Sequence, residues 1–183
     1  MKRVAVFGNA GGGKSTLARR LAETTGLPLV VLDILQYPGG YRRDRAGGGA
    51  ISDERYLELH GEILAGAEWI IDGYGSLASA LERFAVADTL VHVDLPLAIH
   101  CWGVTKRLVK GLFETPRGWP ENSPVLRSSL NAYRVIWPCH NRLTPLYRRV
   151  VADSASKRVH HLRSRGDMRR FLEAVPSEYR GGG

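Results

Sequence analysis

The chain has 183 residues, of which 44% are hydrophobic and 24% charged, which is typical of one globular domain and too short for two ordinary ones. No apolar run is long enough to span a membrane, and the first predicted strand starts almost at Met1. We therefore expect a cytoplasmic protein with no signal peptide and no membrane partner. The net charge of +8 is uneven, since residues 1–100 hold 10 Lys/Arg and 12 Asp/Glu, whereas residues 101–170 hold 15 and 4. Such a basic half suits a polyphosphate, a nucleic acid or an acidic surface.

The first motif along the chain is the sequence of residues 8–15, Gly-Asn-Ala-Gly-Gly-Gly-Lys-Ser. It fits the phosphate-binding loop pattern of Gly, any four residues, then Gly-Lys-Ser. An apolar run at 4–7 precedes it, and an amphipathic run follows, so the pattern lies in the strand, turn and helix setting that it requires. The sequence therefore predicts a nucleotide polyphosphate site.

Each residue type in this loop has a physical role. Glycines let the backbone wrap closely around a ligand with its N–H groups pointing inward, and the start of the following helix favours an anion. Lys14 can neutralise the β- and γ-phosphates, and the Ser15 hydroxyl suits a magnesium ion. The predicted nucleotide-binding residues are Gly11, Gly12, Gly13, Lys14, Ser15 and Thr16.

Next in order, we expect a helix over 14–25 with Gly26 as its stop, and an apolar strand over 29–32 that ends at Asp33. Residues 36–51 are predicted to be an irregular loop that contains Arg42, Arg43 and Arg45. These arginines suit phosphate binding, and they equally suit a solvated loop.

A helix over 54–66 with Ser52 as N-cap, a strand over 69–72, a helix over 77–84 capped by Ser76 and a strand over 89–94 follow. Asp33, Asp72 and Asp94 thus each end a predicted strand. Ligands of parallel sheets bind at the carboxyl ends of the strands, so this pattern indicates function. His92, inside its strand, is expected to be a packed core residue.

The remaining chain predicts a helix over 97–113, a break over 114–124, helices over 125–151 interrupted near Pro138 and Pro145, a strand over 158–162 and a helix over 166–175. We expect one domain over 1–176 and a disordered tail over 177–183. Alternating strands and helices predict an α/β fold, with a five-stranded parallel sheet and helices on both faces.

Cys101 and Cys139 are the two cysteines, and each has a histidine neighbour, His100 and His140. Adjacent residues on a helix point about 100° apart, so both members of a pair would rarely face one metal ion. We interpret both cysteines as free thiols in a reducing compartment.

Several of these segments resemble P-loop kinases related to adenylate kinase. The phosphate loop, Leu32-Asp33, the Trp-Ile-Ile-Asp-Gly run at 69–73 and the Val-Asp-Leu-Pro run at 93–96 carry the resemblance. It is strongest in the first 100 residues and resembles most the FlaR-like subfamily, often labelled DNA topology modulation protein. The resemblance implies a three-layer P-loop NTPase fold with strand order 2-3-1-4-5, ATP as donor, Mg²⁺, and a basic helical lid at about 106–134.

Two departures from the family concern the acceptor. Adenylate kinases carry Asp-Gly-Phe-Pro-Arg after the third strand, where residues 72–76 are Asp-Gly-Tyr-Gly-Ser. The missing arginine weakens AMP as the acceptor. Tyr74 also replaces the asparagine of FlaR-like proteins, which indicates a specialised acceptor pocket.

We therefore predict an ATP-dependent phosphotransferase for a nucleotide or small-molecule acceptor. Positioning and charge neutralisation dominate such a reaction. Lys14 would neutralise the transferred group, Asp33 is favoured as the acceptor-side acid and Asp72, with Ser15, as the metal ligand, although all three strand-end acids compete for these roles. Arg107 is the best lid candidate to clamp the phosphate, with Arg127, Arg134 and Arg142 behind it.

An alternative function is ATP-dependent nucleic-acid binding through the basic 101–170 segment. Four aromatic residues in or near this segment could stack on bases: Trp102, Trp119, Tyr133 and Trp137. A GTPase switch is disfavoured because the chain has no Asn-Lys-x-Asp guanine motif.

Overall fold

A computed structural model describes residues 1–38, 49–111 and 125–180 of the chain. The elements in chain order are β1 (Arg3–Gly8), α1 (Lys14–Thr25), β2 (Leu29–Val31), α2 (Leu32–Gln36), α3 (Asp53–Ala65), β3 (Trp69–Asp72), α4 (Leu77–Val86), β4 (Thr89–Val93), α5 (Leu97–Gly111), α6 (Val125–Pro138), the π-helical turn η1 (Cys139–Leu143), α7 (Thr144–Asp153), β5 (Arg158–Leu162) and α8 (Arg165–Arg180).

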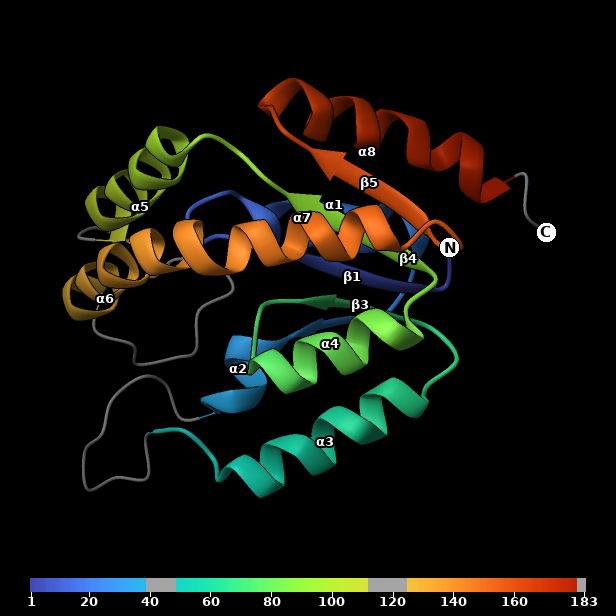
Figure 1. The fold of residues 1–183 in the computed structure, drawn as a ribbon, viewed down its shortest axis with the longest axis horizontal. Helices are drawn as coiled ribbons and strands as arrows, with labels where there is room; N and C mark the ends of the chain where they lie inside the picture. Colours follow the sequence, from blue (N-terminus) through green and yellow to red (C-terminus); the bar gives the residue numbers. More distant parts are fainter. Residues whose placement is uncertain (39–48, 112–124, 181–183) are drawn as a thin grey trace.

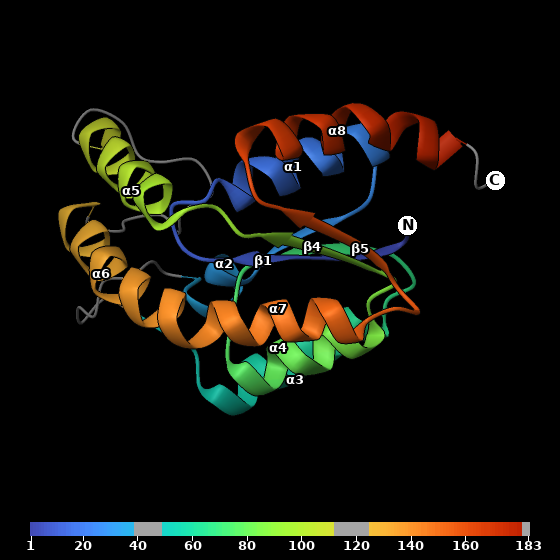
Figure 2. The ribbon, with the colours of Figure 1, turned by 45° about the horizontal axis from the view of Figure 1, so that its top comes forward.

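The five strands form one parallel sheet in the order β2-β3-β1-β4-β5, which confirms the predicted fold class and topology. Helices α1 and α8 cover one face, and α3, α4 and α7 cover the other, while α5 and α6 lie beyond the carboxyl ends of the strands (Figures 1 and 2). The fold therefore has three layers, with the sheet in the middle and β1 as its central strand.

Alternation along β1 divides the core in two. Side chains of a strand point alternately to opposite faces. Val4 and Val6 accordingly pack on the side of α1 and α8, and Ala5 and Phe7 pack on the side of α4 and α7. All four are buried, as expected for a central strand covered on both faces.

The predicted helix starts are confirmed at two serines. The Ser52 side chain accepts a hydrogen bond from the Arg55 N–H, and Ser76 forms a capping box with Ser79 at the start of α4. The second cap matters for the site, because α4 follows directly on the loop that leaves Asp72.

Two predicted boundaries were wrong, and one predicted interruption was confirmed. The strand before Asp33 ends at Val31, because Leu32 is buried against Gly73 and the chain turns there into α2, so Asp33 lies in a short helix. The predicted interruption near Pro138 and Pro145 is confirmed, since α6 ends at Pro138, the π-helical turn η1 follows, and α7 begins at Thr144. Helix α8 continues to Arg180, into the segment predicted to be a tail.

Parts of the predicted lid, loop and tail lie outside the described residues, namely 39–48, which include the three loop arginines, 112–124 and 181–183. Helices α5 and α6 on either side of the second gap pack against each other. Within the described residues, the helices are all too short or too polar to cross a membrane.

We expect Ser76→Ala to lower the free energy of unfolding by about 1 kcal/mol, because the first turn of α4 loses the acceptor of the Ser79 N–H. Urea denaturation measures the change. Ser76→Asp keeps a capping oxygen and should stay close to wild type. Equal stability of the alanine and aspartate variants would contradict the importance of this cap.

Candidate functional site

The loop between β1 and α1 has the geometry of a phosphate cradle. Gly11 and Gly13 have φ angles of 75° and 88°, which favour glycine and turn the backbone around the start of α1. Gly13 is the N-cap of α1 and has no side chain. The N-cap residue therefore supplies no acceptor to the N–H groups of the first helical turn. The loop and first turn contain all six predicted nucleotide-binding residues, and of these Thr16 is exposed.

Lys14 lies folded back onto this loop. Its Nζ donates a hydrogen bond to the Asn9 carbonyl oxygen at 2.8 Å. Burial lowers the pKa of Lys14, the nearby Asp72 and Asp33 raise it, and Arg107 lowers it. Asp33 in α2 and Arg107 in α5 are therefore both within electrostatic range of Lys14 in α1. These are the three residues predicted to be catalytic.

Asp72, the last residue of β3, is the buried carboxylate of this group. It is 2% exposed, and the Ser15 hydroxyl donates a hydrogen bond to it. Burial raises the pKa of Asp72, whereas Lys14 and the Ser15 hydrogen bond lower it. Its Oδ1 atom has no hydrogen-bond partner among the described residues. A buried, unpaired carboxylate oxygen beside a hydroxyl fits a magnesium ion, which prefers oxygen ligands and keeps part of its water shell.

The loop that follows Asp72 is held by a buried arginine from α4. Arg83 is fully buried, and its Nη2 donates to the carbonyl oxygens of Gly73 at 3.0 Å and Tyr74 at 3.3 Å. Its Nη1 lies 3.4 Å from Nε2 of His60. Arg83 thereby fixes the backbone that follows Asp72. The sequence pattern does not mark Arg83 as a site residue, because only the tertiary structure shows that this helix residue points inward.

Asp94 has a different environment from the other two acids. Arg148 binds both carboxylate oxygens, at 2.7 and 3.1 Å, and His161 Nε2 lies 2.8 Å from Oδ2. Burial raises its pKa, but these hydrogen bonds outweigh burial and hold the pKa of Asp94 at about 2. The carboxylate is thus saturated by α7 and β5. Asp94 is therefore engaged by Arg148 and His161, whereas Asp72 keeps a carboxylate oxygen without a hydrogen-bond partner among the described residues.

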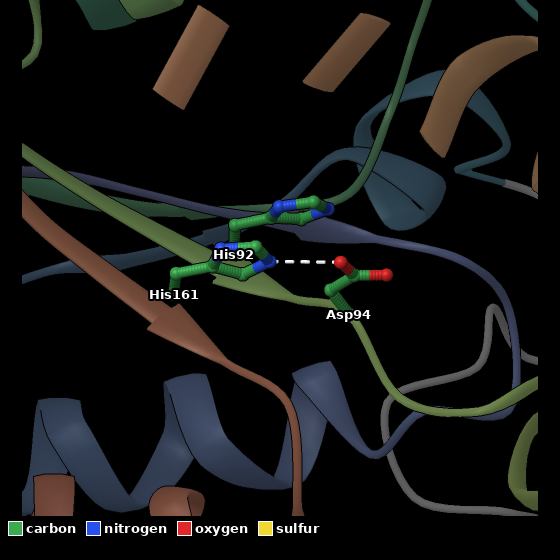
Figure 3. Close-up of side chains that lie close together, drawn as sticks. All are labelled: His92, Asp94 and His161. Carbon is green, nitrogen blue, oxygen red and sulfur yellow. Dashed lines mark hydrogen bonds and ion pairs between the residues drawn. The ribbon is translucent and has the colours of Figure 1, made fainter. Parts of the chain in front are cut away.

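His92, Asp94 and His161 have potential metal-binding atoms that all lie within 4.8 Å of one another (Figure 3). Their arrangement argues against a metal centre. The His92 and His161 rings are stacked, with centroids 4.9 Å apart and planes 14° apart, so their in-plane lone pairs do not converge on one point. Arg148 also occupies the carboxylate with a positive charge.

His92 is a core residue, as predicted. It stacks on Phe7 with ring centroids 5.0 Å apart, and burial lowers its pKa to about 3. The ring is therefore neutral at pH 7. Beside this cluster a cavity of about 470 Å³ is lined by Asp94, Leu95, Pro96, His140, Arg148 and Arg163. The cavity lining includes none of the predicted phosphate-loop residues.

The arginines of the predicted lid differ in their burial. Arg134 and Arg142 are exposed, while Arg107 is half-buried. The loop is tied to α6 by Asn9, whose Nδ2 donates to the Ile136 carbonyl oxygen at 2.9 Å. Of Arg127 only the backbone is described, and Trp119 lies outside the described residues.

The aromatic residues that could stack on bases differ in their exposure to solvent. Trp102 and Trp137 are 66% and 62% exposed. Tyr133 instead hydrogen-bonds the Thr105 hydroxyl between α6 and α5. Cys101 and Cys139 are free thiols, as predicted.

The fold is shared with a solved kinase. Shikimate kinase from Acinetobacter baumannii in complex with shikimate superposes with a TM-score of 0.60 and 17% identity, over 99% of this chain and 94% of that chain. A sugar kinase from Janibacter sp. HTCC2649 (TM-score 0.49, 17% identity, 97% and 91% covered) and a gluconokinase from Sinorhizobium meliloti 1021 (0.45, 16%, 97% and 97%) are less similar. No family model and no curated protein matches the chain. At this identity the comparison establishes a common fold.

We expect Arg148→Met to lower the free energy of unfolding at pH 7 by about 1–3 kcal/mol, because the buried Asp94 carboxylate loses its main partner. The folded pKa of about 2 lies below the ordinary 3.8, so the stabilisation is present above pH 4 and is lost as the pH falls toward 2. The difference between variant and wild type should therefore shrink between pH 5 and pH 3, as measured by urea denaturation at each pH.

Arg149→Met is the matched control, since Arg149 is an exposed neighbour on α7. It should change stability little at either pH. A pH-independent difference for Arg148→Met would show that the arginine acts through packing rather than through the Asp94 charge.

Proposed function

We propose that this protein is a P-loop kinase that transfers the γ-phosphoryl group of ATP to a small acceptor, with Mg²⁺ as its metal ion. The observation that carries the proposal is the convergence of the phosphate cradle with Lys14, Ser15 and the unpaired oxygen of Asp72. The fold shared with a shikimate kinase supports this reaction class. A Gly-rich turn without a catalytic role would need neither a half-buried lysine nor a buried carboxylate at the same sheet edge.

On the donor side, the backbone N–H groups of residues 11–15 would hold the β-phosphate, with Thr16 beside them. Lys14 would exchange its hydrogen bond to the Asn9 carbonyl for the transferred phosphoryl group. The negative charge of that group would keep the lysine protonated despite its burial. Arg107, which acts on Lys14 electrostatically from α5, would clamp the same group from the lid side.

Ser15 and Asp72 would hold the metal ion. When bound, Mg²⁺ neutralises charge on the β- and γ-phosphates. Asp72 would bind through its unpaired Oδ1, directly or through water, and Ser15 through its hydroxyl. Because Arg83 fixes the backbone immediately after Asp72, the carboxylate would be positioned before the nucleotide arrives.

The acceptor would bind on the side of α2 and the loop at 73–75. Asp33 is exposed in the first turn of α2 and acts on Lys14 electrostatically, so its carboxylate can face an acceptor hydroxyl near the donor phosphate and take up its proton. The loop carries no arginine for a nucleotide phosphate. We therefore favour a hydroxylated small molecule over AMP, the class to which the ligand of the similar shikimate kinase also belongs.

The proposal also includes the subfamily, the cellular compartment and the domain organisation of the protein. The motifs at 69–73 and 93–96 support an adenylate-kinase-related, FlaR-like protein acting in the cytoplasm. Residues 1–176 would act as one domain, with a lid over about 106–134 that closes on the nucleotide.

The proposal is tested by incubating the protein with ATP, Mg²⁺ and a panel of sugars, hydroxy acids, nucleosides and nucleotides, and measuring ADP release. At least one acceptor should raise ADP release above background, and Lys14→Met should reduce that rate about 100-fold or more. Lys2→Met, at an exposed lysine far from the loop, should retain the wild-type rate. Salt-dependent DNA binding with no turnover of any acceptor would instead favour the nucleic-acid function.

We also expect Asp72→Asn to raise the Mg²⁺ concentration that nucleotide binding requires. The amide cannot supply a charged oxygen, so the Mg²⁺ concentration at half-maximal ADP binding should rise about 10-fold or more. Titration calorimetry at several Mg²⁺ concentrations measures this shift. Asp88→Asn, at a partly exposed aspartate that bonds the N-terminal backbone, is the control for losing one carboxylate. An equal Mg²⁺ requirement in wild type and Asp72→Asn would contradict the metal role.

A further inference from the structure

Helix α5 is docked directly onto the phosphate loop. A Cβ atom at Gly103 would lie 2.0 Å from the Gly11 carbonyl oxygen, and one at Gly11 would lie 2.2 Å from the His100 carbonyl oxygen. Both distances are far inside van der Waals contact, so both positions require glycine for packing. The phosphate loop is therefore shaped by α5 as well as by the ligand it would bind.

His100 is the side chain at this contact that can carry a charge. It is 2% exposed, and its Nδ1 lies 2.8 Å from the Ala10 carbonyl oxygen, to which it donates. A Cβ atom at Gly12 would lie 2.8 Å from its Cε1 atom. The imidazole thus lies against Ala10 and Gly12, and the His100 backbone carbonyl lies against Gly11 between them.

This hydrogen bond bears on phosphate binding. The peptide group is planar and trans, so a carbonyl drawn toward His100 turns the N–H of Gly11 to the opposite side. In a phosphate loop the backbone N–H groups point toward the anion, so this orientation would direct the Gly11 N–H to a bound phosphate. His100 is therefore a positioning residue for the loop amides.

The groups around the ring act on its charge in opposite directions. Burial lowers the pKa of His100, and the Lys14 ammonium lowers it further. Hydrogen bonds to the Ala10 and Leu95 backbone favour the protonated ring, as does the Asp94 carboxylate. Because Nδ1 donates to the Ala10 carbonyl oxygen, the neutral ring has its single N–H at Nδ1, and a proton taken up would bind at Nε2.

We propose that His100 takes up a proton from solvent when a polyphosphate binds in the loop, and so adds a positive charge beneath the cradle. The proposal rests on the proposed function, because it requires that the loop bind a nucleotide. In the free protein, burial and Lys14 keep the ring neutral. The bound phosphates bring several negative charges to the other side of the loop and neutralise the positive charge of Lys14. Protonation of the His100 ring then becomes favourable.

The pH dependence has a definite sign. The pKa of His100 is higher in the complex than in the free protein, so binding is accompanied by proton uptake between these two pKa values. In that window the affinity rises as the pH falls, by at most about tenfold per pH unit. Below the lower pKa and above the higher one, His100 adds no pH dependence.

Titration calorimetry with MgADP at pH 6, 7 and 8, in buffers of different ionisation enthalpy, counts the protons exchanged on binding. His100→Asn is the test variant, because the Asn amide nitrogen can replace Nδ1 as donor to Ala10 while remaining uncharged. Protons exchanged by ADP itself occur in both proteins, so the difference belongs to His100. We expect wild type to take up a larger fraction of a proton than the variant, and its Kd to fall more steeply as the pH decreases.

His140→Asn is the control, since His140 is partly exposed in η1 and is not hydrogen-bonded to the loop. It should behave as wild type. Equal proton uptake by wild type and His100→Asn would overturn the inference while leaving the kinase proposal intact. Failure of wild type to bind MgADP at any pH would overturn the proposed function itself.

A measurement on the wild-type protein covers the case in which His100→Asn does not fold. Imidazole nitrogen chemical shifts, recorded by NMR with and without MgADP at pH 7, distinguish neutral from protonated rings. We expect the His100 nitrogens to move to imidazolium values on binding. Neutral-ring shifts in the complex would overturn the inference.

Discussion

The central constraint on this structure is the placement of a half-buried lysine and a buried carboxylate at the carboxyl edge of an apolar parallel sheet. Lys14 begins α1 and Asp72 ends β3, and each shifts the pKa of the other toward the charged form against the effect of burial. Isolated charges are costly in such a setting. Their mutual stabilisation is possible because β1 and β3 are adjacent strands, with Val6 in register with Asp72.

The elements around this pair hold it without using up its chemistry. Arg83 fixes the backbone after Asp72 and leaves one carboxylate oxygen unpaired. Asn9 accepts the lysine through its backbone and ties the loop to α6 through its side chain. Helix α5 supports the loop from below through His100. The site is thus preorganised by side chains that are themselves buried, which would limit the reorganisation needed during the proposed reaction.

Asp94 shows that a similar position along a strand can have a different role. Like Asp72, it lies at the carboxyl end of a strand beside β1. Arg148 and His161 saturate its oxygens, so it joins β4, β5 and α7 instead of facing a ligand. The difference arises because α7 covers that side of the sheet, whereas Asp72 faces the first turn of α1.

The sequence by itself determined the phosphate loop, the alternation of strands and helices and the helix caps at Ser52 and Ser76, because these depend on short-range spacing and backbone preference. It also brought Lys14, Asp33, Asp72 and Arg107 forward as candidates. It favoured Asp33 and Asp72 over Asp94 but left the three acids in competition. It could not find Arg83, Arg148 and His100, because their roles depend on which helix packs over which strand end. It placed Asp33 at the end of a strand, whereas burial of Leu32 against Gly73 turns the chain one residue earlier. Tertiary packing alone decided which charges lie together, since electrostatic interactions depend on distances in space and not along the chain.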